Sequence, residues 1–84
     1  MSALPVPTSG ASLTQASFGN KRLVLQNRGT ASVFWDTVSP VTTDTGMEIP
    51  AGWTYEFPSV VAVNSGTIYF VAASGTQDLR WAAI

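Results

Sequence analysis

The sequence predicts an all-β fold, either a small antiparallel β-sandwich or a jelly-roll-like barrel of six to eight short strands. Short segments rich in β-branched and aromatic residues recur along the 84-residue chain, and turn residues separate them at near-regular spacing. Residues 53–57, WTYEF, alternate large aromatic and polar side chains with the period of a strand. Apolar residues do not recur every 3.6 positions over two turns, so little or no helix is expected.

The first 16 residues are predicted to form a flexible N-terminal arm, which leaves residues 17–84 as a single β domain. Two prolines and Gly10 argue against a long helix or strand in this region. Such an arm either stays disordered or orders as an extended segment against a neighbouring subunit. The candidate attachment residues on the arm are Leu4, Pro5, Val6 and Pro7.

The β domain is predicted to begin with a hairpin formed by residues 21–27 and 31–37 around an Asn-Arg-Gly-Thr turn. A short edge strand is expected to start at Val41, and Pro50 is expected at the first corner of a turn. Further strands are predicted at residues 53–57, 59–63, 67–73 and 77–84. The predicted core contains the apolar members of the clearest strands: Leu23, Leu25, Val33, Trp35, Ile68, Phe70 and Leu79.

Composition argues against several classes of partner. Charged residues make up 11% of the chain, where about 25% is usual, and four Lys and Arg face five Asp and Glu. This is too little positive charge for a nucleic-acid-binding protein. No apolar run approaches the ~20 residues of a membrane span, and the N-terminus lacks the basic and apolar regions of a signal peptide. We therefore expect neither nucleic acid nor membrane as a partner.

The Asp44-Thr45-Gly46 triplet matches the active-site motif of aspartic proteases, which need two carboxylates that share a proton. Its surroundings differ from that motif. Polar Thr42 and Thr43 precede it, Met47 follows where a small residue is usual, and the C-terminal segment lacks the expected glycine. The triplet is therefore predicted to be a turn in which Asp44 caps the backbone and Gly46 is left-handed.

Other catalytic and cofactor sites are also not expected. The chain contains neither histidine nor cysteine, which removes the commonest metal ligand, the commonest neutral-pH base and any disulfide. The five carboxylates show no calcium-loop spacing. The sequence therefore predicts a protein that is not an enzyme and that binds no metal or cofactor.

Aromatic residues suggest how this small domain is stabilised. A chain of this length buries only about 60% of its unfolded surface, so its core is thin. Three Trp, two Tyr and four Phe exceed what such a core holds, which predicts a homo-oligomer with Trp53, Tyr55 and Trp81 at the subunit interface. The alternative is a sugar-stacking platform formed by Trp35, Trp53, Tyr55, Tyr69 and Trp81.

Four motifs carry a family resemblance: Ile49-Pro50-Ala51-Gly52, Gly66-Thr67-Ile68-Tyr69, Ala72-Ala73-Ser74-Gly75-Thr76 and Leu79-Arg80-Trp81. With them, residues 22–84 resemble small β-structured virion proteins of tailed bacteriophages. The resemblance implies a structural component of the virion, assembled in the host cytoplasm: a capsid decoration (cement) protein, a head fibre or spike, or a tail component.

The implied partners are the major capsid protein or another virion protein, and further copies of the chain. A trimer is favoured by analogy with capsid spikes at three-fold positions. The alternative function is a carbohydrate-binding module of a phage tail or fibre, whose partner would be a host-surface glycan.

Overall fold

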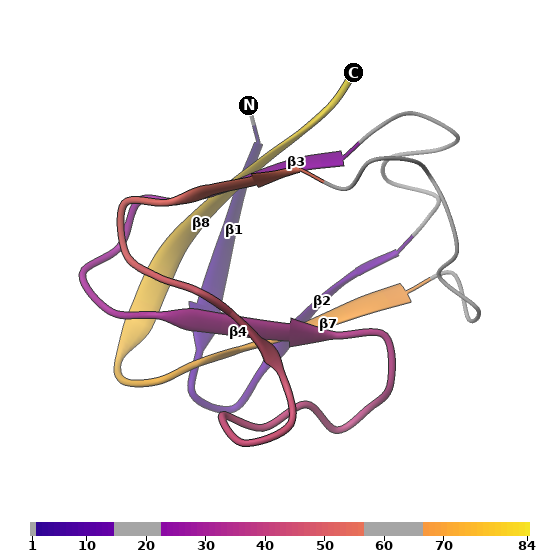
Figure 1. Ribbon diagram of the computed structural model, residues 1–84, viewed down its shortest axis with the longest axis vertical. Helices are drawn as coiled ribbons and strands as arrows, with labels where there is room; N and C mark the ends of the chain where they lie inside the picture. Colours follow the sequence, from indigo (N-terminus) through magenta and orange to yellow (C-terminus); the bar gives the residue numbers. More distant parts are fainter. Residues whose placement is uncertain (1, 15–22, 57–66) are drawn as a thin grey trace.

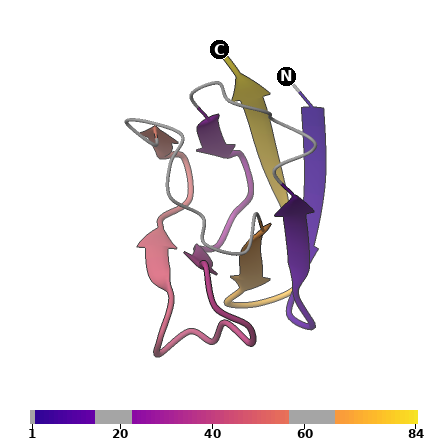
Figure 2. The same ribbon diagram turned by 90° about the vertical axis from the view of Figure 1, so that its right-hand side faces the viewer.

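The fold is that of a computed structural model, which describes residues 2–14, 23–56 and 67–84. The described residues form eight strands and no helix, in two four-stranded antiparallel sheets (Figures 1 and 2). Sheet A has the order β1-β8-β3-β6 and sheet B the order β2-β7-β4-β5. The strands are β1 (Ser2–Pro7), β2 (Ala11–Thr14), β3 (Leu23–Asn27), β4 (Val33–Asp36), β5 (Met47–Ile49), β6 (Thr54–Glu56), β7 (Thr67–Ala72) and β8 (Thr76–Ala83).

Both sheets arise because the chain doubles back on itself between β4 and β5. The strands before and after this point pair in nested order, β4 with β5, β3 with β6, β2 with β7 and β1 with β8. Pairing of β3 with β8 and of β4 with β7 then joins the four pairs into two sheets. This nested pairing is the jelly-roll topology, and it confirms the predicted all-β fold.

The prediction of a flexible N-terminal arm is wrong for residues 2–14, which form β1 and β2 within the two sheets. All six residues of β1 pair with β8, and Val6 is fully buried in the core. Pro5 and Pro7 fit because β1 is an edge strand, where a proline nitrogen can face away from the neighbouring strand. The candidate attachment residues Leu4, Pro5, Val6 and Pro7 therefore belong to sheet A and do not form a free segment.

The core lies between the two sheets and contains most of the residues predicted for it. Alternation along the strands directs every second side chain inward, as in β7, where Ile68 and Phe70 are both fully buried. Trp35 is the exception, since it is half-buried and packs against the core from its edge. The other predicted core residues are buried: Leu23, Leu25, Val33, Ile68, Phe70 and Leu79.

Three local predictions are corrected by the topology. Residues 23–27 and 33–36 do not form a hairpin, because β3 and β4 lie in different sheets. The short edge strand in this region is β5, whereas residues 41–42 have no regular structure and residues 43–46 form a turn and a bend. Pro50 accepts a hydrogen bond from the Trp53 N–H at 3.1 Å, which makes it the first residue of the turn and not its first corner. The strand predicted at residues 59–63 lies outside the described residues.

Substitution of Val6 distinguishes an integral strand from an arm. Val6→Ala removes two buried methyl groups and is expected to lower the free energy of unfolding by about 2–3 kcal/mol. Pro5→Ala, at the exposed neighbouring position, is the matched control and should change it by less than about 1 kcal/mol. Urea denaturation followed by tryptophan fluorescence measures both. Equal stability of Val6→Ala and the wild type would show that β1 does not contribute to the core.

Candidate functional site

The structure separates the three aromatic residues predicted to form a subunit interface. Tyr55 and Trp81 lie on either side of Leu25 on the inner face of sheet A, because both pair with Leu25 in register. Both are half-buried and pack against the core. Trp53 differs, since 63% of its surface is exposed. Trp53 is therefore the predicted interface residue that the domain leaves most available for a partner.

Tyr55 also closes one side of the sandwich together with Trp35. The two rings come from different sheets, Trp35 from β4 and Tyr55 from β6, and their centroids are 5.7 Å apart at an interplanar angle of 46°. A tilted pair at this distance is a favourable arrangement of two aromatic rings. The five aromatic residues proposed as a sugar-stacking platform therefore do not form one row, because Trp35, Tyr55 and Trp81 pack within the domain.

Trp53 lies in a turn whose backbone is held by hydrogen bonds to the backbone of Asn27. Its carbonyl oxygen accepts the Asn27 N–H at 2.9 Å, and the Gly52 N–H donates to the Asn27 carbonyl oxygen at 2.8 Å. Gly52 has a φ of 83°, a left-handed conformation that glycine adopts without strain. The backbone beneath the exposed indole is thus fixed before any partner binds.

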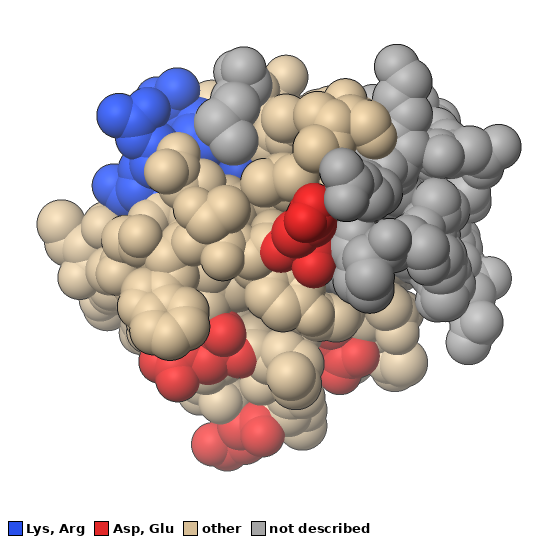
Figure 3. Space-filling model, turned by 45° about the horizontal axis from the view of Figure 1, so that its top comes forward, with Lys and Arg blue, Asp and Glu red and all other residues tan. Residues whose placement is uncertain are grey.

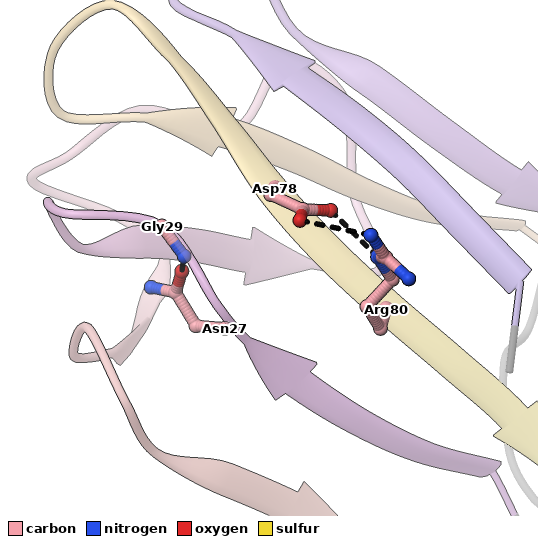
Figure 4. A network of polar contacts seen from close by, with 4 residues as sticks. All are labelled: Asn27, Gly29, Asp78 and Arg80. Atoms are coloured by element: carbon pink, nitrogen blue, oxygen red, sulfur yellow. Dashed lines mark hydrogen bonds and ion pairs between the residues drawn. The ribbon is translucent and has the colours of Figure 1, made fainter.

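Two buried polar side chains, which the sequence analysis did not single out, organise the chain next to this turn. Asn27 is fully buried, and its side-chain amide donates to the carbonyl oxygens of Ile49 at 2.8 Å and Ala31 at 3.0 Å. Its side-chain oxygen accepts the Gly29 N–H at 3.0 Å (Figure 4). One side chain therefore links the end of β3 to β5 and to the connection that follows β3.

Gln77 holds the same connection from β8. Its side-chain oxygen accepts the N–H groups of Thr30 at 2.8 Å and Ala31 at 3.0 Å, while its amide donates to the Ser74 carbonyl oxygen at 2.7 Å. A β-carbon at Gly29 would overlap the side-chain oxygen of Gln77, so this position has no room for a side chain. Strand alternation already places Gln77 on the inward face with Leu79, which is the signal that could have revealed it.

Charged groups gather on the outer face of sheet A beside this connection. The Arg80 guanidinium donates to both carboxylate oxygens of Asp78, at 2.8 and 3.1 Å (Figure 4). This hydrogen bonding lowers the pKa of Asp78 and raises that of Arg80, and the charge of Arg28 lowers the Asp78 value further. Figure 3 shows the basic side chains of the described residues together at one corner, apart from most acidic ones.

Asp44 lies in the loop between β4 and β5, and its surroundings support a turn. It is exposed, and its N–H donates to the Thr42 hydroxyl at 3.2 Å, so Thr42 and not Asp44 caps this turn. Among the described glycines φ is positive at Gly10, Gly52 and Gly75, so the prediction of a left-handed Gly46 is wrong. A β-carbon at Gly46 would instead lie 2.8 Å from both Phe34 Cβ and Val41 Cγ2. Close packing explains this glycine.

A groove of about 270 Å³ lies between the β1–β2 turn and the loop of residues 37–46. Tyr69 of β7 contributes to it from the outer face of sheet B, because its neighbours Ile68 and Phe70 point into the core. Both segments that border the groove lie at the lower end of the molecule in Figure 1. The lining residues are Ser9, Gly10, Ala11, Ser12, Ser39, Pro40, Val41, Tyr69 and Phe70.

Comparisons of the chain with protein families, with curated proteins and with solved structures found no match. Within the described part of the chain, no group of three or more Asp and Glu side chains is placed to hold a metal ion. None of the described residues belongs to a helix long and apolar enough to cross a membrane. The features of the described residues that bear on function are the jelly-roll fold, the exposed Trp53 turn and the groove.

Replacing Gln77 tests whether the polar contacts at the β3–β4 connection stabilise the fold. Gln77→Leu fits the inward position by size but leaves two N–H groups and one carbonyl oxygen unpaired, which should cost about 2–4 kcal/mol of unfolding free energy. Gln26→Leu, the same change on the outer face of sheet A, should stay within about 1 kcal/mol of the wild type. Urea denaturation compares them, and similar effects of both changes would refute the role of Gln77.

The Asp78–Arg80 pair predicts the pH response of one carboxyl group. Asp78 should titrate below its ordinary pKa of 3.8 in the folded protein, and Arg80→Gln should raise the midpoint more than Arg28→Gln does. Because the folded pKa is lowered, the pair stabilises the fold above pH 3.8, and this contribution disappears as the pH falls through the folded value. Carboxyl ¹³C NMR measures the midpoints. The same midpoint in all three proteins would contradict the assignment.

Proposed function

We propose that this chain is a structural component of a bacteriophage virion, a capsid decoration (cement) or spike protein that assembles with copies of itself. The observation that carries the proposal is the jelly-roll pairing of the eight strands in the described residues, an architecture used by viral capsid domains as well as lectins. The sequence resemblance of residues 22–84 to phage virion proteins supports the same conclusion independently.

The surface of the domain favours contact with other copies of the chain. Trp53 exposes a large indole on a backbone fixed by Asn27, and rigid exposed aromatic residues often anchor protein interfaces. The low charge of the chain, 11% of residues, lowers the cost of burying its surface against another subunit. We therefore place the contact between copies at the turn of residues 50–53, with a trimer as the favoured state.

We assign the attachment to the particle to the folded domain and not to the N-terminal arm that the sequence predicted. Residues 2–7 pair with β8 along their whole length, so they are not free to reach the shell. Pro5 and Pro7 also remove donors that an added strand would need at this edge. The proposal is therefore that the folded domain itself contacts the major capsid protein or another virion protein, on particles assembled in the host cytoplasm.

Sedimentation equilibrium tests the assembly. The wild-type protein is expected at about three times the 8.9 kDa chain mass at high micromolar concentration. Trp53→Ser should shift it towards the monomer, because the change removes the exposed indole. Val38→Ser is the matched control, since Val38 has a similar exposure of 65% but lies on another loop. A monomeric wild type, or equal loss of assembly in both variants, would refute the Trp53 contact.

The place of the protein in a particle needs a separate measurement. Virions of the phage that encodes the chain should contain it, and recombinant protein should co-sediment with particles that lack it. A gene position beside capsid and portal genes would agree with this result. Particles without the chain, and no binding by the recombinant protein, would exclude the virion proposal whatever the oligomeric state.

A further inference from the structure

We propose that the groove between the β1–β2 turn and the loop of residues 37–46 binds a neutral hexopyranose, as a single sugar unit of a larger glycan. This inference does not depend on the protein being part of a virion. It rests on the residue types that meet in the groove, on how their positions are fixed and on its size. The site differs from the row of five aromatic residues considered from the sequence, since Tyr69 is the only one of them that lines it.

The lining of the groove matches the chemistry of a sugar. Four of its residues, Ser9, Ser12, Ser39 and Tyr69, carry hydroxyl groups, which donate and accept hydrogen bonds as sugar hydroxyls do. Tyr69 adds an aromatic ring that is half-buried and combines an apolar face with a polar tip. Such a ring can cover the C–H face of a pyranose while hydroxyl groups around it bond to the sugar edge.

The lining residues that the structure describes carry no charge, which favours a neutral ligand. None of these nine residues is Asp, Glu, Lys or Arg, so a charged ligand would lose hydration without gaining a counter-charge from them. Asp36 pairs in register with Tyr69 on the outer face of sheet B, which places a carboxylate close to the groove. This carboxylate would repel sialic acids, uronic acids and phosphorylated sugars.

Both walls of the groove are held in place by the chain itself. Asp36 accepts the Thr37 N–H at 2.7 Å where the loop begins, and Thr42 accepts the Thr45 N–H at 3.1 Å where it turns back. On the opposite wall, the Gly10 N–H donates to the Pro7 carbonyl oxygen at 3.1 Å, with a φ of 100° at Gly10. A site that is already formed loses less entropy when it binds its ligand.

The size of the groove limits what it can hold. A volume of about 270 Å³ lies just below the range of about 300–1,000 Å³ typical of small-molecule pockets. It suits one sugar ring and not an extended chain of several rings. Contact with a single ring through four hydroxyl residues in an open groove predicts weak binding, with a dissociation constant in the millimolar range.

Chemical-shift titration of the purified chain tests the proposal. The probes are methyl α-glucopyranoside, methyl α-mannopyranoside and methyl β-galactopyranoside, each added to about 100 mM, enough to populate a millimolar site. At least one glycoside should move the backbone amide signals of Gly10, Ser12, Val41 and Tyr69. Methyl glucuronide and a Gly-Ser tetrapeptide serve as the charged and peptide comparisons, and both should bind more weakly.

Variants assign the binding to the groove. Tyr69→Phe keeps the ring and should weaken binding about 3–10-fold through the lost hydroxyl, and Ser39→Ala should have a similar effect. Tyr69→Leu removes the ring and should weaken binding more than tenfold. Ser74→Ala is the matched control, because Ser74 is an exposed serine in the β7–β8 turn and its side chain lies outside the groove.

Four results would overturn the proposal. They are the lack of any shift at the groove with all three glycosides, shifts centred on Trp53, stronger binding of the glucuronide or the tetrapeptide, and unchanged binding in both Tyr69→Phe and Ser39→Ala. The last two variants keep the test decisive if Tyr69→Leu does not fold. A monomeric protein that binds a glycoside would refute the assembly proposal alone, and an oligomer that binds none would refute only the groove.

Discussion

Asn27 and Gln77 satisfy the backbone of the segment that crosses from sheet A to sheet B, and several other features depend on this crossing. A chain that leaves a sheet exposes N–H and C=O groups that no longer have strand partners, and burying them unpaired is costly. Asn27 supplies partners for Gly29, Ala31 and Ile49, and Gln77 supplies them from β8. The crossing is therefore stabilised by two side chains that arrive from different strands.

The Trp53 turn follows from the same crossing. The backbone of Asn27 bonds to both Gly52 and Trp53, so the residue whose side chain holds β3 to β5 also fixes the turn that carries the exposed indole. The Arg28 N–H donates to the Asp78 carbonyl oxygen at 2.8 Å, which ties the segment to β8 next to the Asp78–Arg80 pair. Stability and the proposed contact surface thus share one set of hydrogen bonds, and loss of Asn27 would affect both.

Local signals in the sequence predicted the strands well and their partners poorly. The strands predicted at residues 67–73 and 77–84 correspond to β7 and β8, and Phe70 and Leu79, which were predicted to lie in the core, are buried. Pairing is not local, because β1 meets β8 across almost the whole chain. The hairpin expected around residues 27–30 was wrong because Gln77, 46 and 47 residues away from its bonding partners, redirects the chain between the sheets.

The N-terminal segment also could not be assigned from local sequence signals alone. Pro5 and Pro7 argue against a strand when read alone, yet they alternate with Leu4 and Val6 at the period of a strand. Only the position of β1 at the edge of sheet A makes both observations compatible, and no local signal reveals which strand is an edge. The burial of two candidate interface residues could not be predicted from local signals either. Tyr55 and Trp81 are half-buried because both lie next to Leu25 in the sheet.

The Asp-Thr-Gly triplet illustrates how the packing of a loop can require one short motif. Gly46 is required where the loop returns to β5, because any β-carbon there would press against Phe34 and Val41. Its N–H donates to the Thr42 carbonyl oxygen at 2.9 Å, and the Thr42 hydroxyl accepts the N–H groups of both Asp44 and Thr45. These bonds turn the loop back over Phe34 on the outer face of sheet B. Val41, which the same packing fixes, also lines the groove, so the residues that resemble a protease motif instead hold one wall of the proposed sugar site.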